Sequence, residues 1–338
     1  MTITILIPAH NEERSIRATI DSCLRQTRPA DEIVVVNDGS TDRTEEILAT
    51  FGGKIRVITI AVATGNKSHA QEYGLRFVTT DFFACTDGDT ILDEHFVERA
   101  MMNFEDQKVH AVVGYVRSMK YNWLTACRAF EYVIGQNIYK LAQSYIDYIV
   151  VIPGAAGAFR TETFKKYITF DHDTITEDLD FTYSFHKNRL QMSYDREMIV
   201  YTQDPMTLGA YANQLRRWYG GGWQNLMKHK SIISSRFNSA LELSLVYTEC
   251  VIFAFVIFLL PLINLSSFLF FVVSYFILAS ILCLYAGMKE KRWDMAFVPF
   301  TYFFLMYVNS YLFLEQMIKE VILRKKNLYW FTPERTNV

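Results

Sequence analysis

The 338-residue sequence lacks the glycine-rich signatures of two large nucleotide-binding classes. It contains no G-x-G-x-x-G and no Walker loop, so neither a nicotinamide-dependent nor a P-loop enzyme has motif support. No internal repeat and no low-complexity linker is present. The formal net charge is only −2, so nothing in the charge balance indicates a nucleic-acid partner.

Cysteine is scarce and shows no metal-ligand spacing, which predicts free thiols in a reducing compartment. The five cysteines are Cys23, Cys85, Cys127, Cys250 and Cys283. A cleavable apolar leader is also missing, because Met1 runs directly into the segment Thr2–Pro8, which is typical of a short buried strand. We therefore expect the N-terminal domain to stay in the cytosol.

Charge is absent from long stretches near the C-terminus. The chain is 51% hydrophobic, and the excess lies in residues 240–314. A bilayer span needs about 20 apolar residues. The sequence therefore predicts a cytosolic domain over 1–235, spans at 243–263, 265–287 and 295–314 within a membrane region over 240–320, and a basic tail over 321–338. A buried core helix is the alternative for any single stretch.

The predicted turn between the first two spans, around Asn264, is very short and favours a helical hairpin. Basic side chains flank this hairpin and predict cytoplasmic ends for it; they are Lys228, Lys230, Arg236, Lys289, Lys291 and Arg292. Three spans would place the basic tail outside, against the positive-inside rule. A re-entrant or interfacial third stretch is the alternative.

The first hundred residues alternate between strand and helix patterns. Short apolar strands at 3–7, 32–36, 55–60 and 82–85, with helices at 13–25, 41–50 and 67–78, predict an α/β fold with a parallel sheet covered on both faces. Ligands bind such sheets beyond the carboxyl ends of the strands. Asp38, Asp87 and Asp89 follow strand ends, so we expect one crevice to hold all three.

The first candidate functional residues lie in two acidic turns. In Asp87-Gly88-Asp89, two carboxylates separated by one small residue are able to face one Mg²⁺ or Mn²⁺, although an acidic turn without a metal is the alternative. In Asn37–Asp42, Asp38 is placed to accept a hydrogen bond from a base or ribose. A capped turn at the start of a helix explains the same residues.

Two further segments are predicted to line the same pocket. Pro8, Asn11 and Glu12 follow the first strand and are expected to form a wall. Lys67 begins a helix and is placed to bring a cation near a nucleotide, with a solvated surface lysine as the alternative.

The segment Thr176-Glu177-Asp178 begins another predicted helix and offers a general base. The alternative is an N-cap at Thr176 followed by acidic residues that complement the helix dipole. Upstream, Pro153–Arg160 is rich in small residues such as Gly154, which let the backbone approach a ligand closely. This segment predicts the floor of an acceptor site or, equally, tight packing under the sheet.

The motif Q-x-x-R-W lies in a predicted interfacial helix at about 207–230. Gln214, Arg217 and Trp218 stand at i, i+3 and i+4 and so share one helix face. The arginine offers a fork for phosphate oxygens and the tryptophan a platform for a sugar. An amphipathic helix on a membrane surface is the alternative. Gly220-Gly221-Gly222 predicts a flexible segment that moves on substrate binding.

Taken in order, these motifs resemble those of the family 2 processive glycosyltransferases, which include the poly-N-acetylglucosamine, chitin-oligosaccharide, hyaluronan and cellulose synthases. The series is N-D-G-S-T-D, G-N-K, D-G-D, P-G-A-A-G-A-F-R, T-E-D, Q-L-R-R-W and then apolar spans. Asn122–Ile146 and Pro153–Arg160 look most like the poly-N-acetylglucosamine and chitin-oligosaccharide branch. Spans before the catalytic domain are usual in this family, and the sequence shows none. A channel of three spans would be narrow or need partner subunits.

The resemblance implies a GT-A fold, a UDP-sugar donor, Mg²⁺ or Mn²⁺, and inversion at the anomeric carbon. Asp178 would be the general base and Asp89 the metal ligand. Nucleotide-sugar binding would involve Pro8, Asn11, Glu12, Asp38, Lys67, Asp87, Gln214, Arg217 and Trp218. Acceptor binding would involve Gly154, Glu177 and Trp218.

We therefore predict an inverting, processive glycosyltransferase in the plasma membrane, with its catalytic domain in the cytoplasm. It would transfer a hexose or N-acetylhexosamine to a growing β-linked polysaccharide, alone, as a homo-oligomer or with membrane partner subunits. One alternative is the transfer of a single sugar to a lipid carrier or glycolipid at the cytoplasmic leaflet. Another is an inactive membrane scaffold, which the intact acidic set opposes.

Overall fold

A computed structural model describes residues 1–170, 172–231 and 237–326. These residues form two compact units. The first unit contains residues 1–117 and 144–203, and the second contains residues 118–143 and 204–326. Arg236 and most of the predicted basic tail lie outside the described residues. All five cysteines are described as free thiols, as predicted, and four of them are buried.

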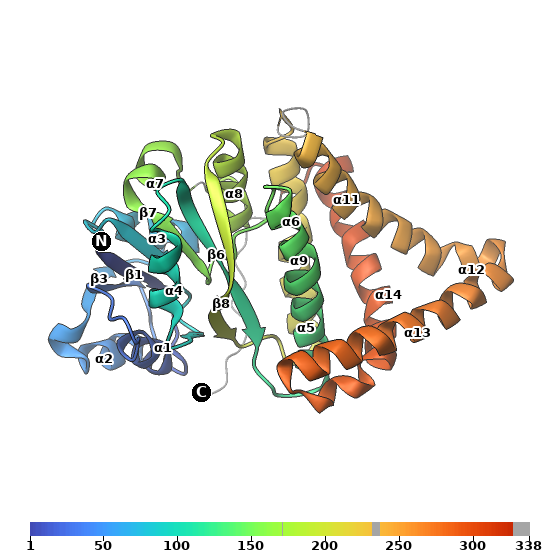
Figure 1. Ribbon diagram of the computed structural model, residues 1–338, viewed down its shortest axis with the longest axis horizontal. Helices are drawn as coiled ribbons and strands as arrows, with labels where there is room; N and C mark the ends of the chain where they lie inside the picture. Colours follow the sequence, from blue (N-terminus) through green and yellow to red (C-terminus); the bar gives the residue numbers. More distant parts are fainter. Residues whose placement is uncertain (171, 232–236, 327–338) are drawn as a thin grey trace. The chain divides into compact units, whose positions relative to one another are not determined.

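The first unit holds one sheet and its covering helices (Figure 1). Its elements are β1 (Ile3–Ala9), α1 (Ile16–Leu24), β2 (Glu32–Asp38), α2 (Thr44–Ala49), η1 (Gly52–Lys54), β3 (Arg56–Ile60), α3 (Lys67–Leu75), β4 (Phe82–Cys85), β5 (Thr90–Leu92), α4 (Phe96–Asn103), β6 (Val109–Ser118), β7 (Gly157–Arg160), α7 (Thr161–Tyr167), α8 (Glu177–Lys187) and β8 (Gln191–Thr202).

The sheet has eight strands in the order β3-β2-β1-β4-β7-β6-β8-β5. Its first four strands are parallel, as predicted, so their carboxyl ends meet at one edge. The sheet continues beyond the predicted strands in mixed directions, because β7 runs antiparallel to both β4 and β6. Cys85, at the carboxyl end of β4, pairs with Gly157, the first residue of β7. The loop that leads into β7 therefore also lies at the carboxyl edge.

Helices cover both faces of this sheet. On one face, α3, α7 and α8 pack against β2, β4, β6 and β7 through a cluster rich in phenylalanine. The rings of Phe159 and Phe181 are 5.4 Å apart, and those of Phe164 and Phe185 are 6.1 Å apart. Elsewhere, α4 packs against β8 and α1 packs against β5. Because Phe181 and Phe185 anchor α8 in the core, the first residues of α8 are held near the sheet edge.

The turn after β2 depends on Gly39. Its φ of +58° is in the left-handed region, and a Cβ at this position would lie 2.3 Å from the backbone nitrogen of Ala63. Only glycine fits such an approach, because both the conformation and the space exclude a side chain. The close contact keeps the segment after β3 against the end of β2.

We expect Gly39→Ala to be more destabilising than Gly52→Ala. Gly52 has nearly the same φ, +54°, but a Cβ there meets nothing within 4 Å. The Gly52 substitution therefore reports the conformational cost alone, about 1–2 kcal/mol, whereas Gly39→Ala adds a backbone clash. Thermal unfolding of the two variants measures the difference. Equal losses of stability would mean that the contact with Ala63 does not constrain the turn.

The second unit is helical. Its elements are α5 (Trp123–Ile134), η2 (Gly135–Lys140), the first three residues of α6 (Leu141–Tyr145), α9 (Leu208–Lys228), α11 (Phe237–Phe258), α12 (Leu260–Ile263), α13 (Leu265–Glu290), η3 (Trp293–Phe297), α14 (Val298–Met317) and η4 (Ile318–Ile322). α11 and α13 meet at α12 and diverge from there, and α14 packs against both (Figure 1).

Among the described residues of this unit, two helical stretches are long and apolar enough to cross a membrane: Leu265–Glu290 and Trp293–Ile322. They contain the second and third predicted spans. The first predicted span is interrupted, because α11 ends at Phe258 and α12 begins at Leu260. Pro261 explains the break, since proline has no N–H for the helical hydrogen bond. Asn264 caps α13 by accepting a hydrogen bond from the Ser267 N–H, which confirms the short predicted turn.

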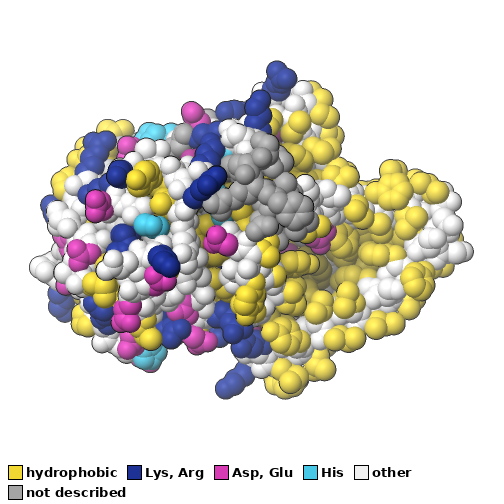
Figure 2. Space-filling view, turned by 45° about the horizontal axis from the view of Figure 1, so that its top comes forward, with side chains coloured by type: hydrophobic (Ala, Val, Ile, Leu, Met, Phe, Trp, Pro, Cys, Tyr) yellow, Lys and Arg dark blue, Asp and Glu magenta, His cyan; other side chains and the backbone are white. Residues whose placement is uncertain are grey.

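α13 exposes most of its large apolar side chains. Phe270 is 75% exposed and Ile277 is 60% exposed, and hydrophobic side chains cover this part of the molecule in Figure 2. A continuous apolar surface of this kind is unfavourable in water and is typical of a surface that contacts lipid or another protein.

Candidate active site

Four loops at the carboxyl edge of β1–β4 carry the predicted site. Asp38, at the end of β2, is buried, and its carboxylate accepts hydrogen bonds from the Thr64 N–H at 2.9 Å and the Thr64 hydroxyl at 2.7 Å. Asn11 adopts a left-handed φ of 56° and accepts a hydrogen bond from the Thr41 N–H at 2.8 Å. These contacts hold the loops after β1, β2 and β3 together at the carboxyl edge of the sheet.

The D-G-D turn packs against the loop after β1. A Cβ on Gly88 would lie 3.0 Å from Cγ of Glu12 and 3.5 Å from the carbonyl oxygen of Pro8. This small residue therefore lets the two loops approach closely. Asp89 is only 5% exposed, and its Oδ1 accepts a hydrogen bond from the Thr90 hydroxyl at 3.3 Å. A carboxylate is thus held at the end of β4 beside the predicted pocket wall.

Lys67 joins the D-G-D turn to α8. Its Nζ forms an ion pair with Asp87, and lies 3.1 Å from Oε1 of Glu177, which is itself buried. The side chain of Lys67 is only 12% exposed, so the alternative of a solvated surface lysine is wrong. Burial alone would lower its pKa, but the nearby carboxylates of Asp87, Glu177 and Asp178 outweigh burial, and the pKa of Lys67 is raised. Lys67 therefore stays charged.

Asp178 is positioned by the start of α8. Its Oδ1 accepts a hydrogen bond from the Leu179 N–H at 2.8 Å. The predicted N-cap role of Thr176 is wrong, because Thr176 occupies the cap position but its side chain makes no cap hydrogen bond. One turn later, the Thr182 hydroxyl accepts a hydrogen bond from the Ile152 N–H at 3.0 Å. That bond fastens the loop before β7 to α8.

Gly154 lies in this fastened loop. A Cβ at Gly154 would be 3.0 Å from Nζ of Lys67, 3.4 Å from Oε1 of Glu177 and 3.7 Å from Cβ of Asp178. The backbone at Gly154 therefore approaches these charged side chains closely, and its role as the floor of an acceptor site stays a prediction. Tight packing applies at Gly157, where a Cβ would meet the ring of Phe159 at 2.7 Å.

The Q-x-x-R-W motif lies on α9, in the second unit. Gln214, Arg217 and Trp218 share one face of the helix, as their spacing predicts. The Oε1 atom of Gln214 is buried without a hydrogen-bond partner. Arg216, the neighbouring arginine, is bound instead to Glu315 of α14 at 2.9 Å. The roles of the motif in donor and acceptor binding stay predictions.

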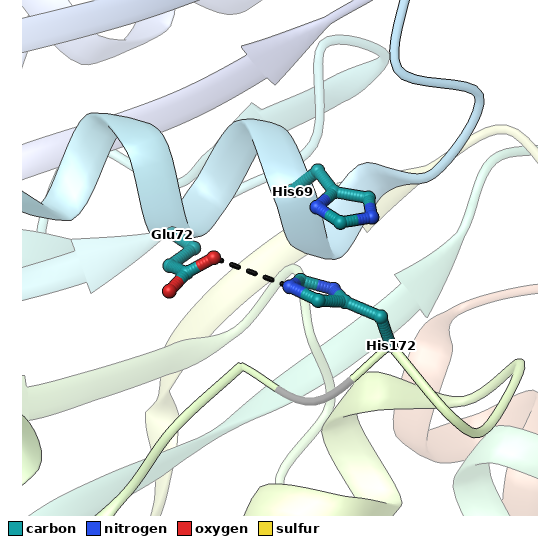
Figure 3. Close-up of side chains that lie close together, drawn as sticks. All are labelled: His69, Glu72 and His172. Carbon is teal, nitrogen blue, oxygen red and sulfur yellow. Dashed lines mark hydrogen bonds and ion pairs between the residues drawn. The ribbon is translucent and has the colours of Figure 1, made fainter.

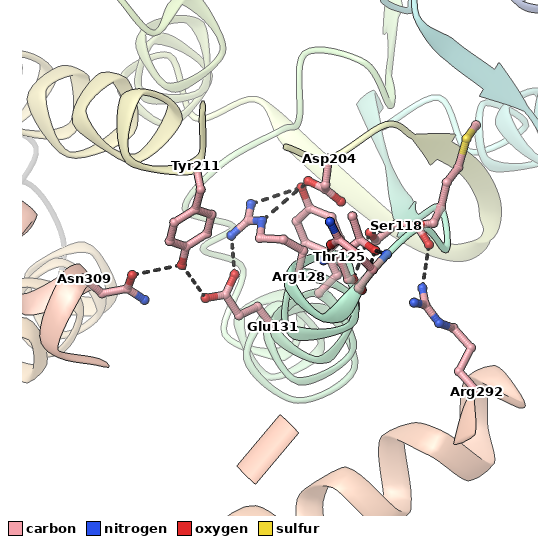
Figure 4. A network of polar contacts seen from close by, with 11 residues as sticks. Ser118, Thr125, Arg128, Glu131, Asp204, Tyr211, Arg292 and Asn309 are labelled. Carbon is pink, nitrogen blue, oxygen red and sulfur yellow. Dashed lines mark hydrogen bonds and ion pairs between the residues drawn. The ribbon is translucent and has the colours of Figure 1, made fainter. Parts of the chain in front are cut away.

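Arg128 is a candidate functional residue that the sequence reasoning missed. Its guanidinium lies 4.6 Å from the ring centre of Trp218 and is only 3% exposed. It forms an ion pair with Glu131 and lies 3.5 Å from Asp204 (Figure 4). A buried guanidinium against an indole face is a favourable cation–π arrangement. In the sequence, this residue was indicated by a pair of charges, Arg128 and Glu131, three positions apart in the largely apolar segment 123–134.

Tyr211 continues this network toward α14, because its hydroxyl lies 2.9 Å from Asn309 and 3.4 Å from Glu131 (Figure 4). The expectation that Gly220-Gly221-Gly222 is a flexible segment is wrong. The three glycines are buried within the continuous helix α9, and a Cβ on Gly220 would lie 3.2 Å from Gln316. Gly220 therefore allows α9 and α14 to pack closely, and Gly222 lies next to Tyr247 of α11.

Several known proteins resemble this chain in sequence. Residues 4–167 match the family model described as Glycosyl transferase family 2. The chain is 28% identical over 230 residues to a poly-beta-1,6-N-acetyl-D-glucosamine synthase of Staphylococcus epidermidis, and 28% identical over 229 residues to one of Staphylococcus aureus. Each match covers 67% of this chain and 56% of the relative, so the chain spans just over half the length of these relatives.

Solved structures show the fold. A mannosyltransferase from Pyrobaculum calidifontis, determined with GDP-Man and Mn²⁺, has a TM-score of 0.64 at 18% identity, covering 96% of this chain and 87% of that chain. S. aureus TarS 1-349, determined with UDP-GlcNAc, has a TM-score of 0.57 at 16% identity, covering 95% and 92%. The predicted GT-A type of α/β fold is therefore confirmed.

The matched region contains β1–β4, the loops at their carboxyl ends and β7, which are the elements that hold Asp38, Lys67, Asp87, Asp89 and Gly154. The family match, the relatives and the fold agree with the ordered motifs. Residues 4–167 of this chain are therefore a glycosyl transferase family 2 domain.

Proposed function

We propose that this chain is a membrane-bound, inverting glycosyltransferase that extends a β-linked polysaccharide with a hexose or N-acetylhexosamine from a UDP-sugar. The proposal extends to processive transfer, because the curated relatives are named as poly-β-1,6-N-acetylglucosamine synthases. N-acetylglucosamine is accordingly the first donor sugar to test.

One observation carries the proposal: Lys67 holds the D-G-D turn and the T-E-D helix together. Its contacts with Asp87 and Glu177 bring the candidate donor-binding carboxylates next to the candidate base, Asp178. A glycosyl transfer site needs a group that binds the donor and a base for the acceptor hydroxyl, both within reach of one substrate pair. This arrangement supplies both.

In the proposed reaction, the acceptor hydroxyl oxygen attacks the anomeric carbon and forms the new glycosidic bond. The bond from that carbon to the donor's phosphate oxygen breaks, and its electron pair leaves with the nucleoside diphosphate. Asp178 takes the hydroxyl proton. The Leu179 N–H holds one oxygen of this carboxylate, which orients the side chain for the transfer. Attack from the face opposite the leaving group inverts the anomeric carbon.

The residues at the end of β4 fit a divalent cation. Asp87 and Asp89 offer hard oxygen donors with one residue between them, which suits Mg²⁺ or Mn²⁺. We propose Asp89 as the protein ligand, and Mn²⁺ is present in the solved mannosyltransferase. When bound, the ion supplies positive charge for the departing diphosphate. Lys67 supplies a fixed positive charge beside Asp87 and keeps the carboxylate cluster compact.

The second unit is proposed to anchor the enzyme in the plasma membrane, as a multi-pass protein with the first unit in the cytoplasm. Its apolar helices α13 and α14 support this anchoring. Gln214 and Arg217 are proposed to bind the donor pyrophosphate, and Trp218 is proposed as a platform for the acceptor sugar. Arg128, which lies against the indole, is then the residue that holds Trp218 in position.

A lipid-linked acceptor is the second candidate. The exposed apolar surface of α13 favours it, because a surface that contacts lipid also gives access to an acceptor dissolved in the bilayer. This enzyme would add one sugar to a lipid carrier or glycolipid and then release it.

Release of UDP by the detergent-purified protein tests the proposal. A panel of UDP-sugars is supplied with Mg²⁺ or Mn²⁺, and the products are sized by mass spectrometry, with Asp178→Asn as the inactive control. We expect a ladder of oligomers from one UDP-sugar. A single product that requires added lipid would support the second candidate. Absence of transfer from every UDP-sugar, with or without lipid, would contradict both.

A further inference from the structure

A second group of ligand-type side chains lies on the first unit, away from the D-G-D turn. His69 and Glu72 come from α3, and His172 comes from the segment before α8 (Figure 3). One potential ligand atom from each residue lies within 4.8 Å of the other two. All three side chains are partly buried. The site chemistry described above uses none of them.

A hydrogen-bond chain orients His172. The Ser68 hydroxyl donates to Oδ1 of Asn66 at 2.9 Å and lies 2.8 Å from Nδ1 of His172. A hydroxyl has one proton, so Ser68 accepts from the Nδ1–H of His172. Nε2 then faces Oε2 of Glu72 at 3.2 Å. A neutral imidazole in this tautomer would direct its lone pair at a carboxylate, so the arrangement is favourable only with a positive charge between the two groups, either a proton on Nε2 or a metal ion.

The chain Asn66–Ser68–His172 also has the form of the support that metal-bound histidines receive. Histidine ligands normally donate their other N–H to an oxygen, which fixes the tautomer and the ring orientation. Here Ser68 provides that oxygen. His69 stacks on His172 with ring centres 3.5 Å apart (Figure 3). A rotation about its χ2, which is a soft torsion in histidine, turns a nitrogen of His69 toward the same point.

We propose that His69, Glu72 and His172 form a binding site for a divalent transition metal of the zinc class. Two imidazoles and one carboxylate match the ligand preference of Zn²⁺, which binds them at about 2.0–2.2 Å. The D-G-D turn offers only carboxylates and so prefers Mg²⁺ or Mn²⁺. The two sites therefore differ in the metal they take.

Such a metal would join two segments that hold active-site residues. α3 begins at Lys67, two residues before His69, and the segment after His172 leads to Glu177 and Asp178. Lys67 already bonds to Glu177 across the same pair of elements. A bound ion would add a second connection between them. We infer that it stabilises the positions of these segments and takes no part in the reaction. The metal site itself does not depend on the proposed function.

Calorimetric titration of the full chain with Zn²⁺ tests the proposal. The protein is purified in detergent without a polyhistidine tag and freed of metal with a chelator. The variants are His172→Ala and Glu72→Gln. The matched control is His95→Ala, because His95 and Glu98 form an exposed pair, 2.9 Å apart, that belongs to no three-ligand group among the described residues. Asp89→Asn tests independence from the D-G-D turn.

We expect one Zn²⁺ per chain, with affinity lowered at least about 10-fold in both ligand variants and unchanged in His95→Ala and Asp89→Asn. Zn²⁺ should also raise the midpoint of thermal unfolding of the unsubstituted chain but not that of His172→Ala. Because Glu72→Gln preserves the shape of the side chain, we expect this variant to fold. A loss of Zn²⁺ affinity in it would then reflect the loss of a ligand. Absence of binding, or equal affinity in His172→Ala and the unsubstituted chain, would overturn the proposal.

Discussion

Asp178→Asn is expected to lower the turnover of glycosyl transfer by roughly 10²–10⁴-fold while leaving donor affinity nearly unchanged. Asparagine keeps an oxygen that accepts the Leu179 N–H, so the local geometry is retained. It has no carboxylate to take the acceptor's proton, so only the chemical step is affected. Single-turnover transfer and donor binding, measured separately, distinguish the two effects.

Asp106→Asn is the matched control for this substitution. Asp106 is an exposed carboxylate of the same unit, and its Oδ1 also accepts a backbone N–H, that of Lys108, at 2.9 Å. It lies after α4, in none of the loops that form the site. We expect this variant to transfer sugar normally. Near-normal turnover in Asp178→Asn as well would remove Asp178 from the role of base.

Lys67→Met is expected to cost about 3–5 kcal/mol of folding stability and to weaken donor binding. The substitution leaves Glu177 buried without its cation and removes the partner of Asp87. Unpaired buried carboxylates repel each other and are poorly solvated, which destabilises the folded state more than the lost attraction alone. Thermal unfolding followed by intrinsic fluorescence measures the loss.

The control is Lys54→Met, the same change at an exposed lysine. We expect that variant to unfold at nearly the temperature of the unsubstituted chain. The double variant Lys67→Met with Glu177→Gln should recover part of the stability, because the buried carboxylate is neutralised. If Lys67→Met were no more destabilising than Lys54→Met, Lys67 would not be the link between the D-G-D turn and α8.

The sequence was sufficient for the parallel half of the sheet and for the position of the candidate site. Strands β1, β2 and β4 are short apolar runs that lead into polar residues, and a pattern of this kind is recognised from neighbouring residues alone. Asp38 and the D-G-D turn follow two of these strands, and parallel strands present their carboxyl ends together. The apolar stretches that form α13 and α14 were also predictable, since length and composition alone identify them.

Other features depended on partners distant in the sequence. The antiparallel strands β6, β7, β8 and β5 were not predicted, because strand direction is decided by pairing between segments up to about a hundred residues apart. Gly220-Gly221-Gly222 suggested flexibility, whereas the contacts of Gly220 with α14 and of Gly222 with α11 explain why small residues are needed there. The break in the first predicted span, in contrast, has a local cause, Pro261, which the average composition of a long stretch does not reveal.

What the sequence by itself determined is the resemblance to glycosyl transferase family 2, the α/β fold and the set of candidate residues, because order and residue type along the chain carry that information. What only the tertiary structure decided is how these residues are connected. Lys67 has the appearance of a surface lysine in the sequence, yet it is buried between Asp87 and Glu177. Arg128 meets Trp218 across 90 residues, and His172 reaches α3 across 100. Burial and charge pairing arise from the packing of separate elements, and no local pattern encodes them.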